Sequence, residues 1–381
     1  MTLSRRNILF LIGGGTILAA GARFATIATR QPRTALLPWD MAGQDPEPRR
    51  RALSFALLAP NPHNRQPWLV DLSEPDAVTL YADPDRLLPH TDPMNRQITI
   101  GLGCFLETLR IAASHGGYQV DITPFPNGED PDRLDSRPVA RAVFRAEPGA
   151  PRDPLFAQIP LRRTTKEPFD TTRPVSADLL ADLGRVVSHT RFGGSVAQAD
   201  IAELRRLTHD ALQIEIETPH TYRESVDLFR IGRAEVDANP DGIDFTGPLF
   251  ETLASLGMMT RETALDPTSQ AYKAGLDAVY ANTDTAMGHV WQVSAGNSRA
   301  DQIATGADWV RLNLEATRLG LGIQPLSQAL QEYPEMSAFY AAVHARFAPD
   351  GGTVQMLARI GYAERPSPSP RWPLDTRIIH A

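Results

Sequence analysis

The spacing of apolar residues along the first part of the chain predicts both helices and strands. Apolar positions recur every three or four residues at 49–58 and 95–115, as on one face of a helix. Gly116 and Gly117 provide a stop for the second of these helices. Apolar and polar residues alternate instead in four segments, which we expect to be strands: 67–72, 77–82, 118–124 and 139–146.

The second part of the chain has the same mixed character. The pattern predicts helices at 176–187, 199–216, 221–238 and 307–319, and strands at 289–294 and 353–362. Ser176 is a suitable N-cap for the first of these helices. Residues 239–267 are less regular, which is typical either of a flap over a site or of ordinary connecting structure. The proline-rich tail, 363–381, is expected to wrap a surface.

The N-terminus has the pattern of an export signal. The apolar run Ile8–Ala22 has 15 residues, fewer than the ~20 that a membrane-spanning helix needs. We therefore expect a signal peptide at 1–22 and a linker at 23–45. Ser4-Arg5-Arg6 resembles a twin-arginine (Tat) signal, which predicts passage through the Tat translocase and a periplasmic or exported protein. Release after cleavage and tethering by an uncleaved signal both remain open.

Composition narrows the class of protein. A chain of 381 residues with 42% hydrophobic residues suits one large or two small globular domains. The net charge of −7 argues against nucleic acid as a partner. The single Cys104 excludes an intrachain disulfide and a cysteine-rich metal site.

Common catalytic motifs are missing from the sequence. It contains neither a GxSxG elbow nor an HExxH motif, so a serine hydrolase and a zinc site of that type are not indicated. Gly101-Leu102-Gly103 lacks the third glycine of a dinucleotide fingerprint, which argues against a Rossmann domain. We expect no metal ligands and no side chain acting as a nucleophile.

Three polar clusters are candidates for binding. APNPHNRQPW (59–68) carries several amides, which can donate and accept at the edge of a planar heterocycle or merely tie down their own turn. Arg162-Arg163-Thr164 suits a phosphate, because a guanidinium donates in a planar fork, although a solvated pair is the alternative. Arg371 in the tail is the third candidate.

A short internal similarity suggests two related halves. Residues 110–117 (RIAASHGG) and 314–321 (LEATRLGL) both end a predicted helix with alanine, three residues and glycine. Each of these helices follows an extended segment at a similar distance, so the two regions could be copies of one unit.

Together these segments resemble the nitroreductase-type FMN flavoproteins. APNPHNRQPW is similar to the PSxxNxQPW motif of that family, and RRTTKEPF to its RRSxRxF phosphate-binding segment. GADWVRLNLEATRLGLGIQPLSQAL and LARIGYAERPSPSPRWPLD resemble the family's helix with its flavin-edge loop and its closing strand and tail. The turn precedes the arginine pair here, an order that resembles the single-chain Acg-like branch, in which two halves form a pseudo-dimer.

The resemblance implies an α+β, nitroreductase-like fold: two related halves, 46–150 and 151–381, with mixed sheets flanked by helices. One FMN would lie between the halves of a monomeric chain. The residues implied in its binding are Asn61, Asn64 and Gln66 at the ring, Arg162, Arg163 and Thr164 at the phosphate and ribityl chain, Gln324 and Pro325 near N5, and Arg371 at the phosphate.

Two positions in the turn bear on activity. Pro62 replaces a family serine and has no backbone N–H to donate. His63 could donate a proton beside the ring, but the sequence favours a surface turn histidine.

The implied function is an exported oxidoreductase that reduces small electron-poor compounds, nitro or quinone-like, through the flavin. NAD(P)H, a quinol or a protein could be the electron donor. The alternatives are a non-catalytic protein that sequesters FMN beneath residues 239–267, and an envelope protein that has lost the flavin.

Overall fold

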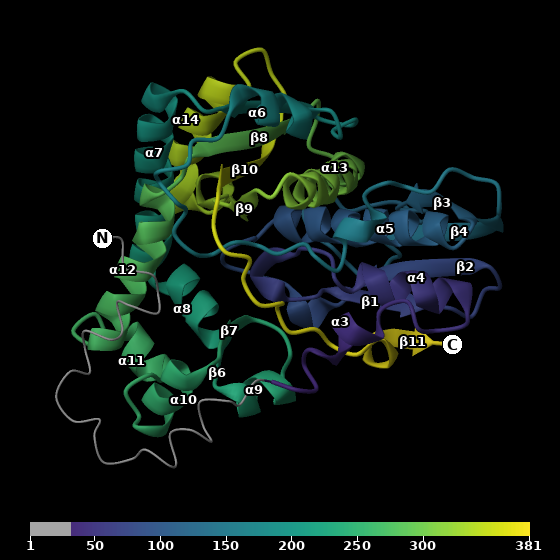
Figure 1. Ribbon diagram of the computed structural model, residues 1–381, viewed down its shortest axis with the longest axis horizontal. Coiled ribbons are helices and arrows are strands. Elements are labelled where there is room, and N and C mark those ends of the chain that lie inside the picture. Colours follow the sequence, from purple (N-terminus) through teal and green to yellow (C-terminus); the bar gives the residue numbers. More distant parts are fainter. Residues whose placement is uncertain (1–31) are drawn as a thin grey trace.

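The computed structural model describes residues 32–381, which form two larger β-sheets with two long helices packed between them, and one two-stranded sheet (Figure 1). This architecture confirms the predicted α+β class. The predicted signal peptide and the first part of the predicted linker lie outside the described residues. No helix of the described part is long and apolar enough to cross a membrane.

The first sheet is built mainly from the N-terminal half. Its strands lie in the order β11-β1-β2-β4-β3, in which β11 (Ile378–His380) is the last strand of the chain. All strands predicted for the N-terminal half are present. The Glu47 carboxylate caps the first helix of this half by accepting the N–H groups of Arg49 and Arg50. The elements of this half are α4 (Pro48–Ala56), β1 (Trp68–Asp71), β2 (Ala77–Ala82), α5 (Arg96–His115), β3 (Tyr118–Pro124) and β4 (Ala140–Ala146).

The second sheet repeats the topology of the first. Its order is β5-β8-β10-β9, with every neighbouring pair antiparallel, as in β1-β2-β4-β3. A 20-residue helix joins the second and third strands of each half, and a glycine with positive φ, Gly117 or Gly320, follows each helix. The elements of this half are α6 (Ala177–Gly184), β5 (Arg191–Ser195), β8 (Gly288–Ser294), α13 (Arg299–Arg318), β9 (Gly322–Pro325), α14 (Ser337–Phe347) and β10 (Thr353–Gly361).

The two halves differ at one connection. Five residues join β1 to β2, whereas residues 196–287 join β5 to β8 and form a separate helical lobe, here called the cap (Figure 1). The cap contains α7 (Gln198–Glu217), α8 (Pro219–Asp227), β6 (Phe229–Ile231), α9 (Arg233–Ala238), β7 (Ile243–Phe245), α10 (Pro248–Ser255), α11 (Arg261–Leu265) and α12 (Gln270–Asp284).

Two expectations about the cap region are wrong. The helix predicted at 221–238 is broken by β6, because Gly232 has φ +82°, outside helical geometry, and β6 pairs with β7. The stretch 239–267 is not irregular, since α10 and α11 lie within it. Long-range packing within the cap therefore decides these segments.

The tail crosses from the C-terminal half to the N-terminal half. It ends in β11 (Ile378–His380), which pairs in parallel with β1. Pro370 and Arg371 are buried, so the expectation of a surface-wrapping tail is wrong for this part. The described part of the predicted linker forms α3 (Leu37–Met41), whose Trp39 donates to the Ser369 carbonyl at 2.8 Å. It is therefore packed structure and not a free connection.

Helices α5 and α13 meet backbone to backbone at two glycines. A Cβ on Gly103 would collide with the Ile303 carbonyl, and one on Gly306 with the Ile100 carbonyl. The Gly101-Leu102-Gly103 sequence, which did not fit a phosphate loop, therefore belongs to a helix contact in which Gly103 permits the close approach.

We expect Gly306→Ala to destabilise the fold by about 2–3 kcal/mol, because the added methyl must separate two packed helices. The measurement is the free energy of unfolding from urea titration. Gly275→Ala on α12 is the matched control, since nothing lies within 4 Å of its Cβ position. The control should be neutral or stabilised by roughly 0.5–1 kcal/mol; equal effects of both substitutions would contradict the proposed contact.

Candidate functional site

One large cavity, of about 1710 Å³, lies where the two halves and the cap meet. The turn after α4, the N-terminal part of α5, the segment around Arg162, α13 and β9 form one side of it. Helices of the cap form the other side. Seven predicted residues line it: Asn61, Asn64, Arg162, Thr164, Gln324, Pro325 and Arg371.

Arg162 and Arg371 converge from distant parts of the sequence on the end of α4. Arg162 Nη2 donates to the Leu58 carbonyl at 3.2 Å. Arg371 donates through Nε to the Leu57 carbonyl at 2.7 Å and through Nη2 to Leu58 and Ala59. The carbonyls that end a helix carry partial negative charge, so they suit cations.

These two guanidinium groups are buried, and their hydrogen-bond partners in the described chain include no carboxylate. Arg162 is 4% exposed and Arg371 2%, and their hydrogen bonds within residues 32–381 go to carbonyls and uncharged side chains. Burial lowers the pKa of Arg162 to about 10 and of Arg371 to about 9; repulsion between neighbouring guanidiniums contributes to both shifts, and the nearby charge of Asp244 opposes the shift of Arg371. A buried positive pair of this kind favours an anion at the cavity wall.

The amides of the turn are largely used within the protein. Asn61 Oδ1 accepts the Gln66 N–H at 2.7 Å, and its Nδ2 donates to the Ala59 carbonyl. Asn64 Oδ1 accepts from Arg371 at 2.6 Å, and its Nδ2 donates to the Pro370 carbonyl. Both side chains line the cavity while they tie the turn to itself and to the tail.

Two predicted residues lie outside the cavity lining. Gln66 is fully buried, donates to the Pro240 carbonyl at 2.7 Å and accepts the Trp372 N–H. Arg163 stacks on Trp39, with 4.4 Å from its guanidinium to the ring centre, and donates to backbone carbonyls. Their contacts join the turn to the cap and the tail, and the segment 161–163 to α3.

The turn holds an unusual backbone. His63, Asn64 and Gln66 all have positive φ, between 46° and 52°, a region that costs non-glycine residues free energy. Pro62 begins a short 3₁₀ turn, where its missing N–H is not needed. Gly101 of α5 allows close packing, because a Cβ there would lie 3.1 Å from Pro62 Cδ. Helix α5 therefore packs directly against the strained turn.

His63 is part of the cavity wall, so the expectation of a surface turn histidine is wrong. Its Nε2 lies 3.1 Å from Ser225 Oγ of the cap. Burial, together with the charges of Lys166 and Arg65, lowers the pKa of His63 to about 4. The imidazole is therefore neutral at pH 7 and is not an imidazolium proton donor.

A buried ion cluster holds the cap on the turn. Asp241 is 4% exposed and accepts from three guanidiniums: Arg65 at 3.2 Å, Arg86 at 2.6 Å and Arg230 at 2.8 Å. Arg65 and Arg86 come from the N-terminal half, whereas Arg230 belongs to β6. Removing the shared carboxylate would leave the buried Arg65 and the partly buried Arg230 without this ion pair, whereas Arg86 would keep Asp83, so the cluster fixes the cap position.

Several cavity residues were not identified from sequence. Trp309 and Asn313 of α13 and Cys104 of α5 line the cavity, and their helical spacing gave only a core signal. Burial raises the pKa of the Cys104 thiol, which argues against a thiolate. The cap contributes lining residues from 212 to 282, well beyond the predicted flap at 239–267. Among residues 32–381, no cluster of His, Cys, Asp and Glu could hold a metal ion.

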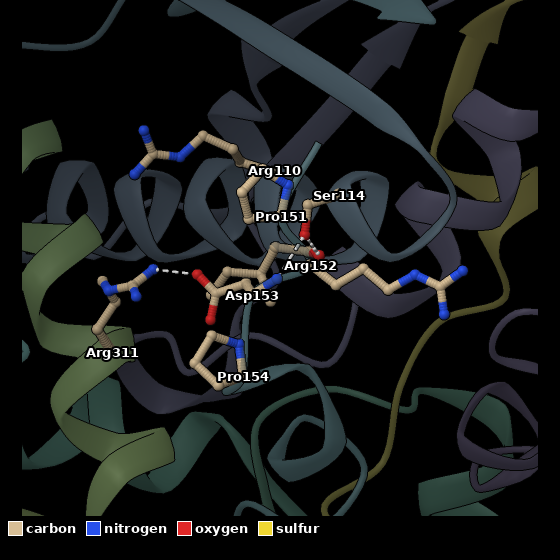
Figure 2. A pocket seen from close by; sticks show the side chains of 8 residues that line it. Arg110, Ser114, Pro151, Arg152, Asp153, Pro154 and Arg311 are labelled. Atoms are coloured by element: carbon tan, nitrogen blue, oxygen red, sulfur yellow. Dashed lines mark hydrogen bonds and ion pairs between the residues drawn. The ribbon is translucent and has the colours of Figure 1, made fainter. Parts of the chain in front are cut away.

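A smaller pocket of about 280 Å³ lies between α5, residues 151–154 and α13. Arg311 forms an ion pair with Asp153 there at 2.8 Å (Figure 2). The side chains of Arg110 and Arg152 extend away from this pair in opposite directions (Figure 2). Arg110 and Arg311 are both paired with the Glu107 carboxylate, at 2.6 and 2.8 Å, so the large cavity is the stronger candidate for binding an anion.

Comparison with known proteins places the chain near the nitroreductases. It is 29% identical over 343 residues to a Mycobacterium tuberculosis protein provisionally named NAD(P)H nitroreductase acg, covering 87% of this chain and 95% of that one. A second protein of that organism, also provisionally named an NAD(P)H nitroreductase, is 26% identical over 84% of this chain and 86% of its own length. No family model matches the chain.

Solved structures of nitroreductases also match part of this chain. The FMN-dependent nitroreductase NfnB of Mycobacterium smegmatis, solved in complex with NADPH, matches with a TM-score of 0.36 and 16% identity, over 57% of this chain and 94% of that one. Along most of its length, the chain is thus similar in sequence to proteins named as nitroreductases.

The neutral state of His63 predicts a pH-dependent contribution to stability. The unfolded state takes up a proton near pH 6.5, whereas the folded state does so only near pH 4. The unfolded state binds more protons in this window, so the contribution is complete above it and is lost as pH falls through it. Relative to His63→Asn, the wild-type unfolding free energy should fall by at most about 3 kcal/mol between these values.

The measurement is urea unfolding of both proteins across this pH range. Asparagine tolerates the positive φ of position 63, and the buried His289 is present in both proteins, so its titration cancels. A constant difference between the two proteins would show that His63 titrates normally.

Proposed function

We propose that this protein is an FMN-dependent oxidoreductase of the nitroreductase type that reduces small electron-poor compounds. The observation that carries the proposal is the pair of buried guanidiniums, Arg162 and Arg371, at the wall of a cavity of about 1710 Å³. Motif resemblance and the names of the similar sequences support the same class.

The residues present fit an FMN phosphate. Arg162 and Arg371 are held by the carbonyls of residues 57–59, and Thr164 adds a hydroxyl at the cavity wall near Arg162. A phosphate dianion would supply the countercharge that these cations lack among their hydrogen-bond partners. Arg163 stacks on Trp39 and donates to backbone carbonyls, so it would not contact the phosphate.

The other cavity residues would orient the ring. Asn61 and Asn64 hold the turn at one wall, and Gln324 and Pro325 on β9 lie at another. The Gln324 side-chain oxygen is fixed, because it accepts from Arg359 at 2.7 Å. Bound flavin would supply hydride or electron transfer, whereas the chain supplies placement and exclusion of water.

We further propose that the repeated topology makes the chain a pseudo-dimer with one flavin. Arg162 and Arg371 come from the C-terminal half, and the carbonyls that hold them come from the N-terminal half. The arginine pair occurs once, so one FMN per monomeric chain is expected. This stoichiometry can be checked by phosphate and protein analysis of purified holoprotein.

The cap favours a second candidate function, storage of FMN without turnover. It forms one wall of the cavity and is held by the Asp241 cluster, which would restrict access. Anaerobic reduction separates the two functions. An oxidoreductase should be bleached by NAD(P)H or a quinol and reoxidised by a nitroaromatic, whereas a storage protein should keep its yellow colour with these reagents.

Export remains part of the proposal, supported by the basic residues and apolar run at 4–22. A fusion of residues 1–45 to a reporter that is active only after export tests it. Lysine at both Arg5 and Arg6 should block export if the Tat translocase is the route, and unchanged export would contradict that route.

We expect Arg162→Gln to weaken FMN binding about tenfold or more, because a hydrogen bond to a charged group contributes about 1.5–3 kcal/mol. Equilibrium dialysis against FMN measures the change. Arg163→Gln is the control from the same segment, and it should change affinity less than about threefold, since Arg163 does not line the cavity. An equal loss in both variants would contradict the assignment.

A further inference from the structure

The large cavity has more room than one bound ligand requires. Pockets for drug-sized ligands are about 300–1,000 Å³, whereas this cavity is about 1710 Å³. The anion-binding arginines lie on the side formed by the two halves. The side formed by the cap is left for a second molecule.

The cap side of the cavity has an apolar wall whose side chains face the open space of the cavity. Leu249 and Leu253 of α10, with Leu256 just after it, face the cavity at helical spacing, yet α10 has no fully buried residue. Leu256 is 65% exposed, so this wall reaches the protein surface. Ala271 and Ala274 of α12 continue it. An apolar molecule here would remove this surface from water.

The cap side also has a polar end with unmet hydrogen bonds. Gln331 Nε2 donates to Glu215 Oε2 at 2.7 Å, and both side chains are more than nine-tenths buried. Within the described chain, the Oε1 atoms of Gln331 and Gln328 are buried and have no hydrogen-bond partner. If the oxygen and nitrogen of such an amide are exchanged, the nitrogen takes the position without a partner. Each amide therefore needs one more hydrogen-bond partner in either orientation.

This polar end adjoins the predicted flavin site. Pro325 ends β9, and Leu326, Ser327 and Gln328 continue along the same cavity wall. Burial, together with the nearby charge of Glu224, raises the pKa of Glu215 to about 7 against the hydrogen bonds from Gln331 and Gln328, which lower it. A carboxyl group with this pKa can both donate and accept at neutral pH.

We propose that the cap side of the cavity binds an amphipathic small molecule. Its apolar body lies along α10 and α12, and its hydrogen-bonding end meets Glu215, Gln328 and Gln331. The inference rests on the proposed function, because the same cavity takes the flavin, and it names the class of the second substrate.

Straight-chain alcohols test the site on FMN-loaded protein by calorimetric titration. We expect 1-octanol to bind at least about tenfold more tightly than 1-propanol, because it buries a longer apolar chain. Gln331→Leu should weaken 1-octanol binding about fivefold, through loss of the polar contact. Gln328→Leu is a second variant that leaves the Gln331–Glu215 hydrogen bond intact.

Glu217→Leu is the control, because Glu217 is exposed on the same helix, α7, and should not alter binding. Circular dichroism and the flavin absorption of each variant report folding and FMN content. Failure of 1-octanol to bind yellow protein, or unchanged affinity in both glutamine variants, would overturn this inference alone. A colourless protein that still binds 1-octanol would instead overturn the proposed function.

Discussion

The site depends on two buried arginines held by the carbonyl groups that follow α4. Arg162 and Arg371 are separated by about two hundred residues, yet both donate to the Leu58 carbonyl. The backbone offers these cations partial negative charge but no full countercharge. No carboxylate of the described chain is hydrogen-bonded to the pair, and this is the basis on which we propose that the cavity wall binds an anion. The tail must cross from one half to the other to bring Arg371 there.

The two halves share a strand order but differ in the connection between their first two strands. The contact of α5 and α13 through Gly103 and Gly306 joins the halves closely. The N-terminal half has a tight connection between β1 and β2, whereas the C-terminal half has the cap at the equivalent place. Asp241 of the cap then ties it back to the N-terminal half through two arginines, Arg65 and Arg86. One side of the cavity therefore carries the buried arginines, whereas the cap side carries the apolar wall of α10 and α12.

Much of the fold could be predicted from local patterns. Helix α5 and strands β1 to β4 follow their predicted ranges closely, because each has a clear apolar period and glycines or prolines at its ends. The break at Gly232 and the helices within 239–267 could not be predicted, since pairing of β6 with β7 and packing within the cap decide them. The short β9 and β5 also went unrecognised, because their glycines weaken the strand pattern.

The candidate site was predictable to a similar degree. Family resemblance identified Arg162 and Arg371, whereas sequence alone could not show that they meet, since that depends on the path of the tail. Gln66 and Arg163 share the same motifs but make contacts outside the cavity lining. Glu215 and Gln331 carried no signal, because their significance arises only where α7 meets the chain after β9.

The central claim is that the arginine pair binds the phosphate of FMN, and a comparison of FMN with riboflavin tests it most directly. The two ligands share the ring and ribityl chain and differ in the phosphate. Isothermal titration of the flavin-free protein should give an affinity for FMN that exceeds that for riboflavin by about 100-fold, as expected for a phosphate held by two arginines. Equal affinities, or no binding of either ligand, would contradict the account.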